Sequence, residues 1–226
     1  MIKRNIPKML KDIRKKLKSR SRAEMKQKLR KQHGERVPIY GVKPSVRNEL
    51  ISKYYRHFKA RKDVEGAFFL AESLVKTKTF EETAIGVGIF SKLSKWFSMH
   101  AFWRLERMLD YMNTAYNTDM FCSKVLSPIL KKYKHETKYI YHWADSTNRW
   151  RRRAAALILL DPIKSGKDVT AGFVMAKKIR GEKNLDVLEA FEILLKALKK
   201  ADRKKLKKFM VEHERKIPRY IVEELE

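Results

Sequence analysis

The spacing of its apolar residues most constrains what this chain can fold into, because helical periods run through nearly the whole sequence. No segment shows sustained period-two alternation with hairpin chemistry, so no strands are expected. Two basic helices are expected within residues 1–36, the second capped by Ser21, and a solvated, partly frayed arm stays open as the alternative. Further helices are expected near 44–58, 63–75, 80–93, 96–114, 117–133, 138–144, 148–161, 168–180, 184–200, 202–214 and 217–225. The sequence therefore predicts an all-α chain of about a dozen helices.

Helices of similar length joined by short loops are typical of antiparallel pairs that stack into an α-solenoid. We therefore expect about six such pairs, forming one domain over residues 1–226. A compact helical bundle stays open as the alternative, because no strict sequence repeat is present. Gly86 and Gly88, two residues apart, are interpreted as lying on one face of the expected helix and as permitting close helix approach, not as binding phosphate.

Charge is the second constraint. Lys and Arg number 54 against 26 Asp and Glu, which gives a formal net charge of +28. Self-repulsion of this size opposes folding, so an abundant polyanion is the expected partner. Nucleic acid is favoured over an anionic membrane surface. The hydrophobic content of 43% is high enough to exclude a disordered basic tail.

The remaining composition narrows the possible chemistry. A single cysteine, Cys122, excludes an internal disulfide and a multi-cysteine zinc site, and the six histidines lack metal-ligand spacing. We therefore expect no metal and no cofactor. Apolar runs are too short to span a bilayer, and no signal peptide is recognisable. The expectation is a cytoplasmic monomer, associated with the nucleoid if the source is prokaryotic.

The stretch 143–155 carries the most specific pattern. An Asp-Ser-Thr-Asn turn precedes Arg149, Trp150 and three further arginines, which open directly onto an apolar run. Asn148 suits the N-cap of a helix that runs toward Asp161-Pro162, where proline would end it. Cations in the first turn interact unfavourably with the helix dipole, so we expect an anionic partner for them. The phosphate backbone of a nucleic acid is the favoured candidate.

These residues resemble the signature of the AlkD-type DNA alkylation repair glycosylases, which are built from HEAT-like helix pairs. The pattern is Trp143-x-x-Ser146-x-Asn148-x-Trp150-x-x-Arg153-Ala154-Ala155, and the order of helices fits across nearly the whole chain. Tyr40-Gly41-Val42-Lys43-Pro44 followed by Arg47 is similar to an upstream motif of the family, one residue shorter. The resemblance implies a curved shell with a basic concave face that holds duplex DNA, and excision of cationic N3- or N7-alkylated purines without base flipping.

Specific residues carry these implied roles. Asp119 matches the carboxylate that acts near the deoxyribose of the lesion, and Arg153 matches the arginine that grips the adjacent phosphate. The DNA-binding set is expected to include Arg152, Arg149, Trp150, Tyr116, Lys43 and Arg47. The family's aromatic positions are not kept, because they fall on Ala115, on Ile193 and near Gln32.

Alternatives stay open at several of these positions. Asp119 is also placed to stabilise a helix N-terminus, Tyr116 could contact the lesion or pack, and Trp143 and Trp150 are typical packing anchors. At the level of function, the competing interpretations are a non-catalytic protein that recognises damaged or branched DNA by shape and charge, and a basic scaffold for RNA or another partner. Loss of the family aromatics favours the first of these competitors.

Overall fold

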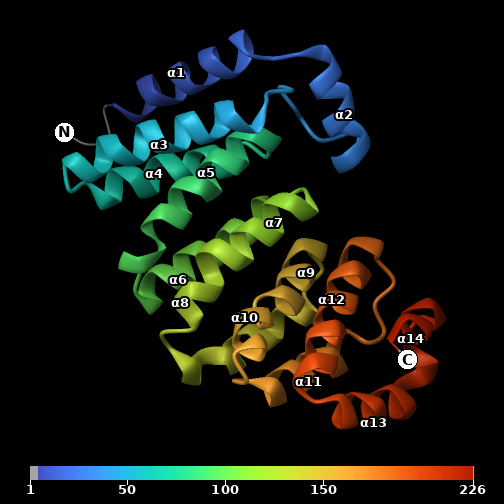
Figure 1. Cartoon of the computed structure of the whole chain (residues 1–226). Helices are drawn as coiled ribbons and strands as arrows, with labels where there is room; N and C mark the ends of the chain where they lie inside the picture. The colour runs from blue at the N-terminus through green and yellow to red at the C-terminus, as the bar shows by residue number, and fades with distance from the viewer. Residues whose placement is uncertain (1–4, 226) are drawn as a thin grey trace. The chain divides into compact units, whose positions relative to one another are not determined.

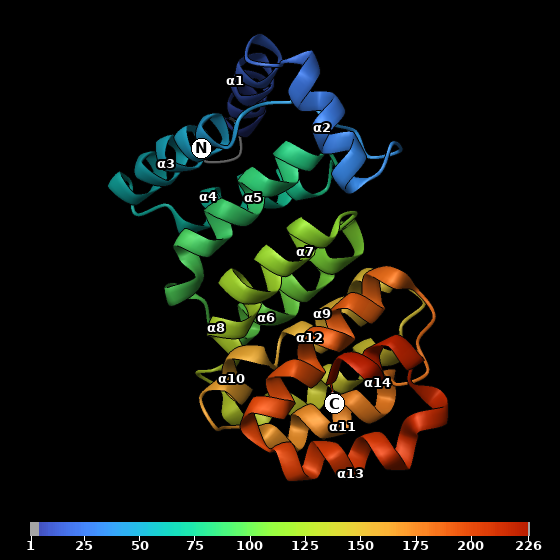
Figure 2. The ribbon, with the colours of Figure 1, turned by 45° about the vertical axis from the view of Figure 1, so that its right-hand side comes forward.

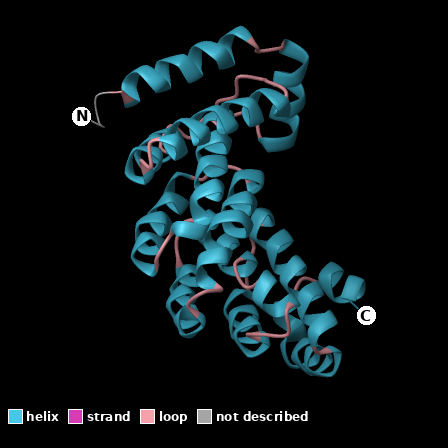
Figure 3. Ribbon diagram, turned by 60° about the vertical axis from the view of Figure 1, so that its left-hand side comes forward, coloured by secondary structure: helices cyan, strands magenta, loops and turns pink. Residues whose placement is uncertain are grey.

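The computed structural model describes residues 5–225, except for the side chains of residues 134–138, and every regular element in this part of the chain is helical (Figure 3). The all-α prediction is confirmed. The chain divides into two compact units, Met1–Val125 and Leu126–Glu226, and each unit is described by itself below. The predicted single solenoid domain stays a prediction.

Unit 1 is organised around one central helix, α5 (Phe80–Leu93), which packs against three others (Figure 1). Its partners are α3 (Pro44–Ala60), α4 (Val64–Val75) and α7 (Ala115–Phe121). The unit also contains α1 (Ile6–Ser19), α2 (Ala23–His33), α6 (Met99–Glu106) and the 3-10 segments η2 (Ser94–Trp96) and η3 (Arg107–Tyr111). A π-helical segment, Cys122–Leu126, contains the boundary between the units.

The two glycines of α5 do permit close helix approach, but they face different neighbours. A Cβ atom on Gly86 would lie 2.6 Å from the carbonyl oxygen of Ala71 in α4, whereas one on Gly88 would lie 2.3 Å from Cδ1 of Ile51 in α3. Two residues turn a helix by about 200°, so they cannot share one face. The single-face interpretation was wrong, and each glycine admits its own neighbouring helix.

The N-terminal helices are packed elements and not a solvated arm. The apolar stripe of α1 is buried, with Ile13 and Leu17 fully inaccessible, and the hydroxyl of Tyr54 in α3 donates to the carbonyl oxygen of Met9. Burial, aided by the charge of Asp12, raises the pKa of Tyr54 to about 12. Leu29 of α2 joins Ile39 and Phe80 in a separate apolar cluster.

Unit 2 is arranged around α12 (Leu185–Ala201), as the view in Figure 2 shows. Five helices pack on it: α9 (Arg149–Leu157), α10 (Leu160–Lys164), α11 (Val169–Ile179), α13 (Arg203–His213) and α14 (Arg219–Leu225). The remaining elements are α8 (Ser127–Leu130) and the 3-10 segments η5 (Lys134–Asp145) and η6 (Glu214–Lys216). Phe191, Leu194 and Leu195 place the apolar side of α12 fully inside the unit.

Four predicted boundaries need correction. The expected helix 96–114 is broken into α6 and a 3-10 segment, and the expected helix 117–133 starts two residues early and contains a π-helical turn. Ser21 does not cap α2, because its hydroxyl donates instead to the carbonyl oxygen of Tyr40. The helix that starts at Arg149 ends at Leu157, and Pro162 lies inside α10, in a first turn where a backbone N–H is not required.

Candidate nucleic-acid interface

A buried carboxylate shapes the loop that precedes α3 in unit 1. Glu81, in the first turn of α5, is fully inaccessible to solvent. Its two oxygens accept hydrogen bonds from the backbone N–H groups of Tyr40 (2.9 Å), Gly41 (2.7 Å) and Val42 (3.3 Å). A buried carboxylate is stable only when donors surround it, and here the loop itself supplies them. Glu81 thus fixes the backbone from which Lys43 and Arg47 continue.

The neighbouring Glu82 holds the other side of the same loop. Its carboxylate accepts from the hydroxyl of Tyr40 at 2.7 Å and from Nε of Arg14 in α1 at 3.2 Å. Burial, followed by the hydrogen bond to Glu82, raises the pKa of Tyr40 far above its ordinary value, so the phenol stays protonated. Two adjacent acidic residues of α5 therefore tie α1 and the loop to the core of unit 1.

Gly41 is required at its position in this loop. Its φ of 87° lies in the left-handed region that glycine adopts without strain. A Cβ atom there would lie 2.6 Å from Cβ and 2.7 Å from the backbone nitrogen of Lys26. The carbonyl oxygen of Gly41 accepts from the backbone N–H of Arg22, at the start of α2. The backbone of the loop thus lies in direct contact with the backbone of α2.

The loop leads to a cationic recess at the start of α3. Arg20, Arg22 and Lys43 line a polar cavity of about 310 Å³, together with Ser45 and Glu49. No side chain caps the N-terminus of α3, and Lys43 occupies the N-cap position. Pro44 has no N–H, and the N–H of Val46 donates to the carbonyl oxygen of Lys43. The cationic side chains are therefore what attracts an anion here. This corner of unit 1 has the electrostatics of a phosphate contact.

Arg47 lies at the centre of a ring cluster in the same unit. The side chain is 8% exposed, and its guanidinium carbon lies 5.2 Å from the ring centroid of Phe80 and 5.4 Å from that of Tyr116. His33, the last residue of α2, stacks on Phe80 with centroids 4.4 Å apart, and its ring lies 6.1 Å from that of Tyr116. A cation over ring faces is stabilising when it is desolvated.

His33 is kept neutral by this setting. Burial is the largest cause that lowers its pKa, and the nearby Arg47 lowers it further, while Glu81 opposes the change. A neutral imidazole can stack closely on Phe80 without adding another positive charge beside Arg47. The cluster therefore contains one fixed cation and three rings.

Asp119 and Tyr116 lie on α7, three residues apart. Tyr116 is 40% exposed, whereas Asp119 is partly buried, one turn further along the helix. Thr114 caps α7 by accepting from the backbone N–H of Asn117, and Asn117 donates to the carbonyl oxygen of Phe80. Residues three apart share a helix face, so the Asp119 carboxylate follows the exposed phenol along one side of α7.

In unit 2 the predicted start of α9 is confirmed. The side chain of Asn148 accepts a hydrogen bond from the backbone N–H of Trp150 at 2.9 Å, as an N-cap residue should. Trp143 is fully buried and Trp150 is 7% exposed. The packing interpretation therefore accounts for both rings, and Arg149 lies 4.7 Å from the ring centroid of Trp150. Contact of Trp150 with DNA stays a prediction.

Three arginines of α9 have anionic partners inside the unit. Arg149 pairs with Asp186 at 3.3 Å, Arg152 with Glu182 at 2.6 Å, and Arg153 with Glu189 at 2.8 Å. Arg153 is only 1% exposed and also donates to the carbonyl oxygen of Asp186. The anionic partner that the sequence predicted for these arginines is thus found within the protein, in carboxylates of α12 and of the loop before it. Phosphate contact by Arg149, Arg152 and Arg153 stays a prediction.

Glu182 is the most strongly engaged of these carboxylates. Partial burial by itself raises the pKa of Glu182, but hydrogen bonds from Arg152 and from the backbone N–H groups of Asn184 and Lys183 lower it below its ordinary value. Arg152 also donates to the carbonyl oxygens of Ser146 and Thr147. One arginine therefore joins the turn before α9 to the turn before α12.

Several features of these sites lie beyond the sequence patterns. Glu81, Glu82, Phe80 and His33 were not anticipated; two adjacent acids at the start of an apolar helix were the only signal.

The family's aromatic positions can now be placed in the structure. Gln32 is exposed at the end of α2, Ala115 opens α7, and Ile193 is 36% exposed on α12. His33 and Tyr116 each follow one residue after a position where a family aromatic was expected. Asp119 belongs to unit 1 and Arg153 to unit 2.

No group of three or more His, Cys, Asp or Glu side chains in the described part of the chain could hold a metal ion. Within the same residues, no helix is both long and apolar enough to cross a membrane.

Fold and charge define the class: an all-α protein with a formal charge of +28 and a cationic recess suited to a polyanion. The family model described as DNA alkylation repair enzyme matches residues 13–224, so the chain belongs to that family. No curated protein shows significant similarity to the chain. Membership of the family implies a role in DNA repair and an interaction with DNA.

Proposed function

We propose that this protein is a DNA glycosylase that hydrolyses the N-glycosidic bond of cationic N3- or N7-alkylated purines in duplex DNA. The observation that carries the proposal is the family match over residues 13–224, combined with a carboxylate at Asp119 beside the exposed ring of Tyr116. A repair enzyme acts where DNA is, so we expect an intracellular location, at the nucleoid in a prokaryote.

Hydrolysis of this glycosidic bond needs few catalytic groups. An alkylated purine already carries positive charge, so the bond from C1′ to the base breaks with its electron pair going to the purine, which leaves neutral. The sugar becomes an oxocarbenium ion, which the Asp119 carboxylate stabilises by charge. Water then adds to C1′, and the carboxylate accepts its proton. This sequence balances without a metal or a cofactor.

Binding of the DNA backbone is assigned first to unit 1. Lys43, with Arg20 and Arg22, lines the recess at the start of α3, where an oxygen of a phosphodiester would meet cationic side chains. Arg47 contributes less directly, by holding the ring of Tyr116 in place. In unit 2, Arg149 is exposed enough to add a backbone contact while keeping its carboxylate partner, Asp186.

The direct test is release of base from a duplex that carries N7-methylguanine or N3-methyladenine, measured by chromatography against an unmethylated duplex of the same sequence. The proposal predicts release of the methylated base alone, with no dependence on added divalent metal. Absence of release at saturating enzyme would exclude glycosylase activity on these lesions.

The second candidate function is non-catalytic recognition of damaged or branched DNA. It is favoured by the residues at the family's aromatic positions, because Ala115 and Ile193 offer no ring to a lesion. This alternative predicts tight binding that weakens steeply as salt rises, without base release. Equal affinity for intact, methylated and branched duplexes would count against it.

A further inference from the structure

A groove at the end of unit 2 combines charge with an apolar floor. It encloses about 800 Å³ between α12, α13 and α14, a volume within the range of about 300–1,000 Å³ that is typical of binding pockets. Its apolar lining comes from Leu206, Met210 and Val211 of α13 and from Val222 and Leu225 of α14. Val211 is 72% exposed, so apolar surface continues onto the rim.

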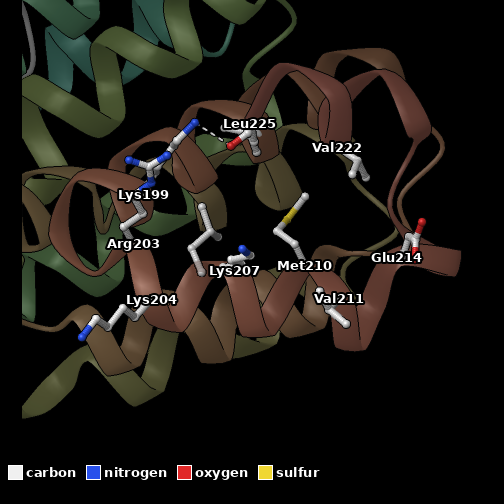
Figure 4. Close-up of a pocket in the computed structure, with 10 residues that line it drawn as sticks. Lys199, Arg203, Lys204, Lys207, Met210, Val211, Glu214, Val222 and Leu225 are labelled. Atoms are coloured by element: carbon white, nitrogen blue, oxygen red, sulfur yellow. Dashed lines mark hydrogen bonds between the residues drawn. The ribbon is translucent and has the colours of Figure 1, made fainter.

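The cationic side chains of the groove are gathered at one end, and its one acidic lining residue, Glu214, lies at the opposite end. Lys199, Arg203 and Lys204 lie together on one side of the view, Met210 and Val222 lie toward the other side, and Lys207 lies between them (Figure 4). Lys199 donates to the carbonyl oxygen of Leu225. Among the side chains that the structure describes, no carboxylate forms an ion pair with Arg203, Lys204 or Lys207. These cations therefore lack the compensation that the arginines of α9 have.

The dimensions fit a short secondary-structure element. From Arg203 to Val211 the helix α13 rises by about 12 Å, which is roughly two helical turns of a ligand. An occupant that fills this length must present apolar groups to Met210 and Val222, and anionic groups to the cationic end. An amphipathic helix with acidic flanks has this combination, because apolar side chains recur on one face at three- and four-residue spacing.

We propose that this groove is a docking site for an acidic amphipathic helix of a partner protein. Duplex DNA is a poorer occupant, since its outer surface is a regular array of phosphates and offers no apolar face to Met210 or Leu225. A second copy of this chain is disfavoured by charge, because both copies carry +28. The groove lies apart from Asp119 and the recess of unit 1 in sequence, so the proposal does not rest on glycosylase activity.

The probe is a fluorescein-labelled peptide of about 18 residues with Leu at one helical face and Glu elsewhere, titrated with the full chain at about 0.3 M NaCl to suppress non-specific attraction. Fluorescence anisotropy should show saturable binding below about 100 µM. A scrambled peptide of the same composition should bind at least about tenfold more weakly, because it cannot present its leucines together.

Two variants with the same charge change locate the site. Lys207 lines the groove and Lys208, its exposed neighbour on α13, does not. We expect Lys207→Glu to weaken peptide binding about tenfold and Lys208→Glu by less than about threefold. Met210→Gln, which keeps the volume of the side chain, should weaken binding about fivefold or more. Circular dichroism checks that each variant stays folded.

Several outcomes would overturn the proposal. One is absence of saturable binding; another is equal binding of the ordered and scrambled peptides. Equal effects of Lys207→Glu and Lys208→Glu would reduce the attraction to net charge alone. Saturable binding to anionic vesicles, or dimerisation of the chain, that is lost in Met210→Gln would assign the groove to a lipid or to a second copy instead.

Discussion

The loop before α3 in unit 1 and the start of α9 in unit 2 differ in how their charged side chains are neutralised. In unit 1 a buried carboxylate, Glu81, is surrounded by backbone N–H groups, and the nearby cations Arg20, Arg22 and Lys43 line an open recess. In unit 2 a row of arginines meets carboxylates of the turn before α12 and of α12 itself. The first arrangement leaves cationic side chains available to a polyanion, and the second largely compensates them.

This difference bears on how a basic sequence motif is interpreted. A run of arginines suggested a phosphate grip, yet its most buried member, Arg153, is bound to Glu189 and to a backbone carbonyl. A weaker motif at residues 40–47 leads into the recess, where Arg20, Arg22 and Lys43 outnumber the one acid, Glu49. The density of cations in a sequence is therefore a poor guide to which of them face DNA, because folding supplies some of the anions.

The largest expected effect is on the loop of unit 1. Glu81→Ala leaves three backbone N–H groups without their acceptor, so the free energy of unfolding should fall by about 3–5 kcal/mol. Chemical denaturation measures this loss. Glu49→Ala is the matched control, since Glu49 is an exposed acid with a surface partner, Lys16, and should cost under about 1 kcal/mol. Similar losses for both would show that Glu81 does not organise the loop.

A smaller loss is expected at Gly41. Alanine there combines a left-handed φ with a Cβ atom 2.7 Å from the backbone of Lys26, so Gly41→Ala should destabilise by about 2–3 kcal/mol. Gly34 also has a positive φ, but nothing lies within 4 Å of its Cβ position, and Gly34→Ala should cost about 1 kcal/mol. Equal thermal shifts in the two variants would contradict the close approach of α2 to the loop.

In unit 2 the strength of the ion pair between Arg152 and Glu182 can be measured. A double-mutant cycle on Arg152 and Glu182, using Arg152→Gln and Glu182→Gln, should give a coupling free energy of about 1–2 kcal/mol, because both side chains are largely shielded and hydrogen-bonded. The exposed pair Arg219 and Glu223 is the control, with an expected coupling below about 0.5 kcal/mol. A coupling near zero for Arg152 and Glu182 would remove the contrast between the two units.

The smallest expected effect is a pH dependence from the ring cluster. The pKa of His33 is lowered by burial and by Arg47, so the unfolded chain binds its proton at a higher pH than the folded chain does. This contribution to stability is complete above 6.5, the ordinary value, and is lost as the pH falls below it. Denaturation at pH 7.0 and 5.5 should show a smaller difference for His33→Gln than for the wild type. An unchanged difference would contradict a partly buried imidazole whose neutral form is favoured in the folded chain.

The sequence predicted the helices well where apolar spacing and caps agreed. Residues 80–93 and the cap at Asn148 were found because a regular stripe and a capping side chain mark them locally. The break after Glu106 and the π-helical turn at Cys122 have no such local signal, because tertiary packing sets them. For the sites, the arginines were visible, but their partners Glu182 and Glu189 lie about thirty residues away and could be identified only from the fold.

The central claim is that this family member uses Asp119 to cleave a glycosidic bond, and Asp119→Asn tests it most directly. The measurement pairs the single-turnover rate of base release from a methylated duplex with the dissociation constant for the same duplex. We expect release to fall at least about a hundredfold, with the dissociation constant changed by less than about threefold, since the substitution removes charge near the sugar and not a phosphate contact. Undiminished release by Asp119→Asn, or an equal loss of binding and release, would contradict the assigned role of Asp119.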